Sequence, residues 1–296
     1  MYGPLIIGYL FLGGTAAAGL LITAVQSLVF AARSHGGTSW TVALGRSGEG
    51  VETFLKRGYL VSWVLLLFAM AMLFFDLGRP GQTLLVFLNL RRTVISFGAV
   101  CLALEALLGA LLVAATVFKV QLLCGWVQVA LNLLCCLVSP AVMGYTAVFL
   151  MGSVGISLWG TWTLVPLFVF SSLSCGLALV MLLDYFFKDL MLAPFAAAPL
   201  HKAHVISAVL ELVSLVFFAA VTWLNPQCAT AVQVLLHPKM LMAAAVGVVG
   251  MGILVPLAAE GLALVRRDYR PSATACALGL VGGLLLRYCV IVCGVF

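Results

Sequence analysis

Charged residues are scarce in this sequence. They make up 8% of its 296 residues, whereas a soluble domain has roughly 25%. Residues 1–32 and 120–183 contain no charge at all, and each of these stretches is longer than the about 20 apolar residues that cross a bilayer. With 65% hydrophobic residues and a mean hydropathy of +1.24, the chain is predicted to be an all-α integral membrane protein with many spans.

Ligands for metals and clusters are also sparse. The nine cysteines form no Cys-x-x-Cys pair, so we expect small apolar core residues rather than an iron–sulfur or zinc site. All four histidines fall near predicted loops, and a membrane haem needs axial ligands at depth within the spans. His201 and His204 are three residues apart, but they have no third ligand nearby in the sequence. We therefore expect no haem or iron–sulfur cluster in this chain.

Apolar runs separated by charged residues predict eight spans. They lie at about 4–32, 58–76, 94–118, 121–151, 162–187, 203–223, 240–265 and 273–295. No charge divides the fourth and fifth spans, and we place the turn between them at Ser153 to Thr161, which is rich in glycine. Pro140 is predicted to kink the fourth span. An even number of spans puts both termini on one side.

The positions of lysine and arginine predict which side that is. The odd-numbered loops carry ten of these residues and the even-numbered loops carry four. Because basic residues collect on the cytoplasmic side, the odd loops should be cytoplasmic and both termini outside. The net charge of +6 therefore reflects membrane topology and gives no indication of nucleic acid binding.

A weak internal repeat divides the predicted spans into two groups. Leu102 to Leu107 in span three resembles Leu257 to Leu262 in span seven. Phe11 and Gly19–Leu20 of span one recur as Phe168 and Gly176–Leu177 in span five. Two tandem four-helix bundles, residues 1–152 and 153–296, would explain both matches; chance similarity between Leu- and Ala-rich helices is the alternative. Such a repeat is parallel, whereas many transporters have inverted repeats.

Five ionisable residues lie in or at the ends of these spans: Asp76, Glu105, Glu211, Glu260 and Arg287. Charges inside a bilayer are costly unless they are paired or hydrated, so such residues are functional candidates. Their predicted depths run from the outer end at Asp76 to the inner end at Glu260, which would suit a proton pathway. The alternative is a set of structural clamps between helices.

A second group of candidates gathers at the outer ends of the first four spans. Tyr9, Asp76, Arg79 and Tyr145 would be neighbours there, beside the small residues of span one. Hydroxyl, carboxylate and guanidinium groups around an apolar crevice suit a quinone head group, which needs hydrogen bonds and proton exchange.

The loop after span two also carries a basic cluster, formed by Arg79, Arg91 and Arg92. Its positive charge lies on the side that has few basic residues, so something should compensate it. Lipid phosphate is one candidate partner. A docked protein subunit, or an anionic ligand held against Arg79, is the other.

Several of these segments together resemble a known family. They are Gly8–Gly14 with Gly19, Asp76–Pro80, Gly144–Thr146, Pro166–Phe168 with Ser171 and Gly176, Glu211, and Gly282–Tyr288. In order and spacing they are similar to the NrfD/PsrC group of polysulfide reductase-type membrane subunits, which is related to the dimethyl sulfoxide reductase anchor. The likeness spans most of the chain.

This resemblance implies a quinone-reactive anchor subunit of a respiratory oxidoreductase in the inner membrane of a prokaryote. Menaquinol or another quinone would bind in the first bundle, with Asp76, Arg79 and Tyr145 at the site and Tyr9 and Thr15 lining span one. Electrons would pass to a ferredoxin-like iron–sulfur subunit and through it to a molybdopterin or cytochrome catalytic subunit. The same fold could oxidise quinol or reduce quinone.

Two other functions fit parts of the sequence. A secondary transporter or proton-conducting protein would use the buried ionisable residues, although the two halves lack paired broken helices. A purely structural anchor would need only the spans and the basic loop.

Overall fold

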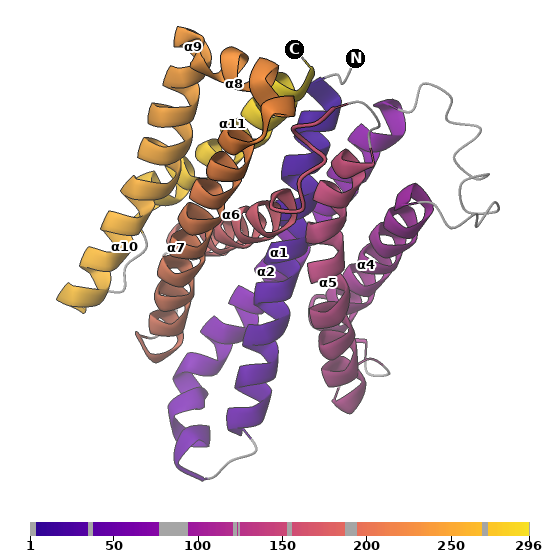
Figure 1. Ribbon diagram of the computed structural model, residues 1–296. Coiled ribbons are helices and arrows are strands. Elements are labelled where there is room, and N and C mark those ends of the chain that lie inside the picture. The colour runs from indigo at the N-terminus through magenta and orange to yellow at the C-terminus, as the bar shows by residue number, and fades with distance from the viewer. Residues whose placement is uncertain are drawn as a thin grey trace.

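The computed structural model describes residues 4–34, 38–76, 94–120, 123, 125–152, 156–186, 194–267 and 272–295. Within these ranges the chain is almost entirely helical and has no β-strand (Figure 1). Eight helical segments among the described residues are long and apolar enough to cross a membrane: Pro4–Ala32, Gly50–Asp76, Ser96–Thr116, Trp126–Met151, Leu164–Phe186, Ala197–Leu224, Pro238–Arg266 and Ala273–Val295. The prediction of an all-α protein with eight spans is confirmed.

The first four spans contact one another around α1 (Pro4–Ser34). Helix α1 packs on α2 (Thr38–Asp76) and α5 (Trp126–Met151), and α4 (Val94–Thr116) packs on α2 and α5. Small residues allow close approach between these helices. Gly58 of α2, for example, faces Thr23 of α1, and a side-chain carbon there would lie 2.7 Å from the threonine hydroxyl.

The turn between the fourth and fifth spans lies where the sequence predicts it. Helix α5 continues through Pro140 and ends at Met151, and α6 begins at Leu164 (Leu164–Phe186). Residues 156–163 between them form turns. Residues 153–155 lie outside the described residues.

Helix α6 packs on α1 as well as on α7 (Pro194–Leu224) and α11 (Ala273–Val295). At the α1 contact a side-chain carbon on Gly176 would lie 2.9 Å from the backbone nitrogen of Gly19, so only glycine fits there. One apolar core runs from Tyr9 in α1 to Cys293 in α11. The division into two bundles at residue 152 stays a prediction.

Span seven is not one continuous α-helix. It consists of α9 (Pro238–Met242), the π-helix η5 (Ala243–Leu254) and α10 (Val255–Arg266). The Val255 N–H donates to the Gly250 carbonyl, five residues earlier, and Pro256 follows, which has no N–H to donate. Glycines let the backbone of η5 contact the backbone of α11 directly. A side-chain carbon on Gly252 would lie only 2.6 Å from the Gly282 Cα.

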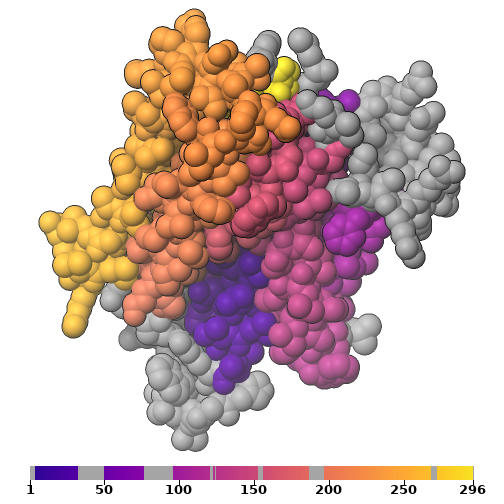
Figure 2. Space-filling model, in the orientation of Figure 1, coloured from indigo at the N-terminus to yellow at the C-terminus, as the bar shows by residue number. Residues whose placement is uncertain are grey.

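Outside this core, large apolar side chains face outward. On α7 they include Ile206, Val213 and Val216, and Figure 2 shows α7 on the outer surface beside α10. Such a surface suits lipid contact.

The helix α1 begins, and α11 ends, at the same end of the molecule (Figure 1), as an even number of spans requires. The 3₁₀-helix η4 (Pro226–Cys228) and the short helix α8 (Ala229–Leu236) connect α7 to span seven at that end.

Candidate functional site

Two tyrosines meet at the end of the molecule where α1 begins. Tyr9 of α1 is 1% exposed and Tyr145 of α5 is 6% exposed. The Tyr145 phenol faces Tyr9, yet the Tyr9 hydroxyl has no partner in hydrogen-bond geometry. Gly98 of α4 lies against the Tyr145 ring, and any larger residue there would overlap it. The three helices therefore pack closely around two neighbouring buried phenols, and the Tyr9 hydroxyl has no partner in hydrogen-bond geometry.

Asp76 is the last residue of α2, at the same end of the molecule, and is partly buried. One turn before it, Met72 faces Gly8 of α1: a side-chain carbon at Gly8 would lie 2.8 Å from the Met72 sulfur. Residues four apart share a helix face, so the Asp76 carboxylate lies on the face of α2 that turns toward the start of α1. Arg79, Arg91 and Arg92 lie outside the described residues.

Thr15 lies on a different face of α1. It is 2% exposed and lies beside Cys175 of α6. Tyr9, by contrast, turns toward α5. The structure therefore brings together Tyr9 and Tyr145, with Asp76 at the same end, but it does not bring Thr15 to them.

Arg287 of α11 occupies the centre of the contact between α1, α6 and α11 and is fully buried. Its guanidinium donates to the hydroxyls of Ser171 (2.9 Å) and Ser172 (2.8 Å) and to the carbonyls of Gly283 (2.9 Å) and Leu10 (3.3 Å). The rings of Phe11 and Phe168 lie 5.7 and 5.4 Å from its central carbon, within the range of cation–π attraction.

Glu211 of α7 is an acidic residue within electrostatic range of Arg287. Its carboxyl group is 4% exposed and lies within hydrogen-bonding reach of Ser171 and Ser174 of α6, with Arg287 close enough to interact electrostatically. Ser171 therefore stands between the guanidinium and the carboxylate. Such a hydroxyl can donate to one group and accept from the other.

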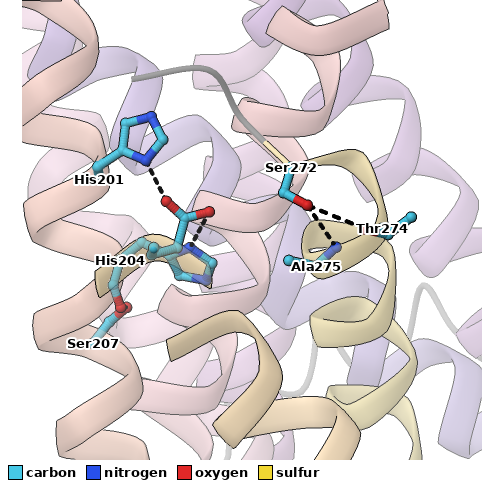
Figure 3. A network of polar contacts seen from close by, with 7 residues as sticks. His201, His204, Ser207, Ser272, Thr274 and Ala275 are labelled. Atoms are coloured by element: carbon cyan, nitrogen blue, oxygen red, sulfur yellow. Dashed lines mark hydrogen bonds and ion pairs between the residues drawn. The ribbon is translucent and has the colours of Figure 1, made fainter. Parts of the chain in front are cut away.

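A third buried cluster joins α7 to α10 (Figure 3). The Nδ1 atom of His201 forms a hydrogen bond with the Glu260 carboxylate, and Nδ1 of His204 lies 3.9 Å from its other oxygen. All three side chains are 2% exposed or less. In the same view, Ser272 caps the start of α11 by accepting from the Ala275 N–H. The cluster thus lies where α7 and α11 begin, at the end opposite the two tyrosines.

These two clusters lie along the same helix, α7. His204 and Glu211 interact electrostatically and are seven residues apart on one face, or about 10 Å along the helix. The resulting series runs from Glu260 through His204 and Glu211 to Ser171 and Arg287. It contains three of the five ionisable residues that the sequence singled out.

Glu105 of α4 belongs to another group. Its Oε1 atom accepts a hydrogen bond from Ser139 (2.6 Å), its Oε2 atom is buried without a partner, and the Cys135 thiol lies 3.8 Å from Oε1. Two turns away on α5, Asn132 accepts from the Tyr59 hydroxyl at 2.6 Å and donates to Ser27 at 3.0 Å. Among the described residues, no hydrogen bond or ion pair joins Glu105 to Arg287 or Glu260.

Sequence reasoning missed the role of the histidines. It treated His201 and His204 as residues near a loop, whereas both are buried partners of Glu260. The spacing His201, His204, Ser207 and Glu211, which repeats every three or four residues on one face of α7, is the signal that would have found them. Within the described residues, no group of three or more potential metal ligands is present.

The fold and these buried polar groups define a class: an eight-span helical membrane protein with ionisable and hydroxyl side chains held at depth. A family model described as "Polysulphide reductase, NrfD" matches residues 1–296, the whole chain. The chain belongs to the NrfD family, whose members are membrane subunits of respiratory oxidoreductases and associate with iron–sulfur and catalytic subunits. A search of curated proteins found no match.

Proposed function

We propose that this protein is a quinone-interacting anchor subunit that exchanges electrons between menaquinol, or another quinone, and an iron–sulfur partner subunit. The partner would pass electrons on to a molybdopterin or cytochrome catalytic subunit. The observation that carries the proposal is the Tyr9 and Tyr145 pair, which holds an unpartnered buried hydroxyl at the same end as Asp76. Membership of the NrfD family supports the same function.

The residues at this end fit a quinone head group. Its carbonyl oxygens need hydrogen-bond donors, and the Tyr9 hydroxyl is a buried donor with no partner of its own. When bound, a quinone supplies two-electron chemistry coupled to two protons. Tyr9 and Tyr145 would orient the head group, and the Asp76 carboxylate would hold or release a proton at the membrane end. Burial of both tyrosines excludes water from the site.

Substitution of Tyr145 by Phe tests this proposal in the purified complex. Removing one hydrogen bond of about 1 kcal/mol should slow quinol-dependent reduction of the iron–sulfur partner roughly fivefold to tenfold. Tyr288→Phe is the matched control, because Tyr288 is 39% exposed on α11. Quinol oxidation at the same rate in both variants, with the partner subunits still bound, would contradict the proposal.

We also propose that the series from Glu260 to Arg287 conducts protons. Imidazole, carboxyl and hydroxyl groups each both bind and release protons or pass them along hydrogen bonds, and they are arranged here from one end of the molecule toward its centre. A purely structural clamp would need only Glu260 and one histidine.

Glu260→Gln and Glu105→Gln separate the two possibilities. In the complex reconstituted into vesicles, Glu260→Gln should reduce proton movement across the membrane at least tenfold while quinol oxidation continues. Glu105→Gln, in the group nearer the tyrosines, should slow quinol turnover itself. Equal loss of quinol oxidation in both variants would contradict this division of roles.

A further inference from the structure

A half-open apolar cavity lies in the second half of the protein, away from the sites above. Helices α7, α8, η5 and α11 line it, and its volume is about 290 Å³. Ligand pockets range from roughly 300 to 1,000 Å³, so the cavity suits a narrow ligand rather than a bulky ring system. The π-helix η5 forms one wall with Ala244 and Val248. Such helices are rare and are found frequently at functional sites.

One of the residues that line this cavity has a buried hydroxyl without a partner. The Thr222 hydroxyl of α7 is 7% exposed and has no hydrogen-bond partner. Threonines within helices commonly donate to the carbonyl four residues earlier, as Ser214 does on the same helix at 2.7 Å. A buried hydroxyl without a partner is unfavourable. Thr222 is therefore the one described lining residue with an unused hydroxyl donor at the wall of the cavity.

The direction of the cavity indicates what kind of molecule this is. Thr222 lies two residues before the end of α7, at the depth where a span meets the lipid head groups. Trp223 beside it is 65% exposed, as is typical of a side chain at the membrane interface. From there the cavity extends to Leu215, seven residues earlier on α7, which is about 10 Å deeper along the helix.

We infer that the cavity holds one acyl chain of a membrane phospholipid, with the Thr222 hydroxyl donating to the ester carbonyl at the start of that chain. The chain would run inward between Val248 of η5 and Leu286 of α11, which are 4% and 2% exposed. Hydrocarbon matches a lining whose described residues, apart from Thr222 and two cysteines, are all aliphatic or aromatic.

A reacting quinone head group does not fit this cavity. Quinone turnover needs groups that bind and release protons, and none of the described lining residues carries a carboxyl group, an imidazole or an amine. The thiols of Cys289 and Cys293 are buried at 7% and 6% exposure. The phospholipid site is therefore independent of the proposed quinone site and does not rest on it.

Native mass spectrometry of the purified complex in mild detergent tests this inference by counting retained phospholipids. Ala244→Phe fills the cavity and should remove one phospholipid per complex. Ala220→Phe adds the same ring on an exposed position of α7 outside the cavity and should retain it. Thr222→Val keeps the shape but removes the donor, so the detergent concentration that strips the lipid should fall twofold to tenfold, the equivalent of one hydrogen bond.

A labelling experiment keeps the inference testable if Ala244→Phe does not fold. After delipidation, an alkyl maleimide should modify Cys293, and vesicles of phosphatidylethanolamine and phosphatidylglycerol should restore protection. Cys276, which is 0% exposed and outside the cavity lining, serves as the internal control and should be unaffected by lipid. Protection by a long-chain quinone but not by phospholipid would overturn the inference. So would wild-type complex that retains no phospholipid, or equal retention in Ala244→Phe and Ala220→Phe.

Discussion

At the scale of single residues, the arrangement around Arg287 shows how a charge can be buried at membrane depth. Two hydroxyls and two backbone carbonyls accept its hydrogen bonds, and these acceptors come from α1, α6 and α11. Glu211 supplies the opposite charge across Ser171. Because the guanidinium presents its donors in a fixed planar fork, one side chain can join three helices.

Replacement of Arg287 should therefore destabilise the protein strongly. We expect Arg287→Met to lower the free energy of unfolding by about 3–5 kcal/mol, because it leaves Glu211 as an uncompensated buried charge. Arg287→Lys, which keeps the charge but loses the fork, should cost about 1–3 kcal/mol. Thermal unfolding in detergent measures both, with exposed Arg266 replaced by Lys as the control.

A double variant tests whether Glu211 is the partner. Combining Arg287→Met with Glu211→Gln removes both charges, so part of the lost stability should return. A loss in the double variant equal to the sum of the losses in the two single variants would mean that the two charges are not coupled. Wild-type stability in Arg287→Met would contradict the buried-charge account altogether.

At the scale of elements, the sequence predicts depth far better than rotation. Apolar runs place the spans within about five residues of the observed helices, except that α2 begins at Thr38 rather than at 58 and α7 begins at Pro194 rather than at 203. The predicted span was begun after charged residues such as Glu52 and Lys56. A helix can continue through such residues outside the bilayer, and here the two form an ion pair at 2.8 Å. Hydropathy therefore marks the membrane boundary and not the helix boundary.

Rotation depends on which neighbour each helix packs against, and hydropathy carries no such information. Tyr9 and Tyr145 were predicted to be neighbours from depth alone, and the structure brings them together. Thr15 was assigned to the same site, but its side chain turns toward α6. It lies six residues after Tyr9, and in a helix with 3.6 residues per turn this spacing places the two side chains on different faces.

The π-helix in span seven was also beyond prediction. Its sequence is as apolar as that of the other spans. Pro256 lacks an N–H donor, but this alone does not indicate which turns of the helix change to the π form. The backbone contact between Gly252 and Gly282 depends on the partner helix. Elements of this kind follow from tertiary contacts rather than from local sequence.

At the scale of the whole molecule, the two candidate sites lie at opposite ends. Tyr9 lies near the start of α1, whereas the cluster of Glu260 with His201 and His204 lies near the starts of α7 and α11. The excess of lysine and arginine in the odd loops predicts that the tyrosine end faces outward. Protons released by quinol at the tyrosines would then leave on the outer side, whereas the Glu260 cluster would exchange protons with the cytoplasm.

Cysteine labelling on intact cells tests this orientation. An impermeant thiol reagent should modify Gln227→Cys, an exposed position between α7 and α8 at the predicted outer end. It should spare Phe118→Cys, which is 75% exposed just after α4 at the opposite end. Permeabilised cells are the control, since both positions should then react.

The reverse pattern would invert the energetic argument as well as the topology. With the tyrosines inside, quinol oxidation would release its protons into the cytoplasm, and the Glu260 cluster would open to the outside. The series from Glu260 to Arg287 would then bring protons inward from the outer side. Labelling of Gln227→Cys alone in intact cells is therefore the result that keeps the quinone site, the proton series and the bias of basic residues mutually consistent.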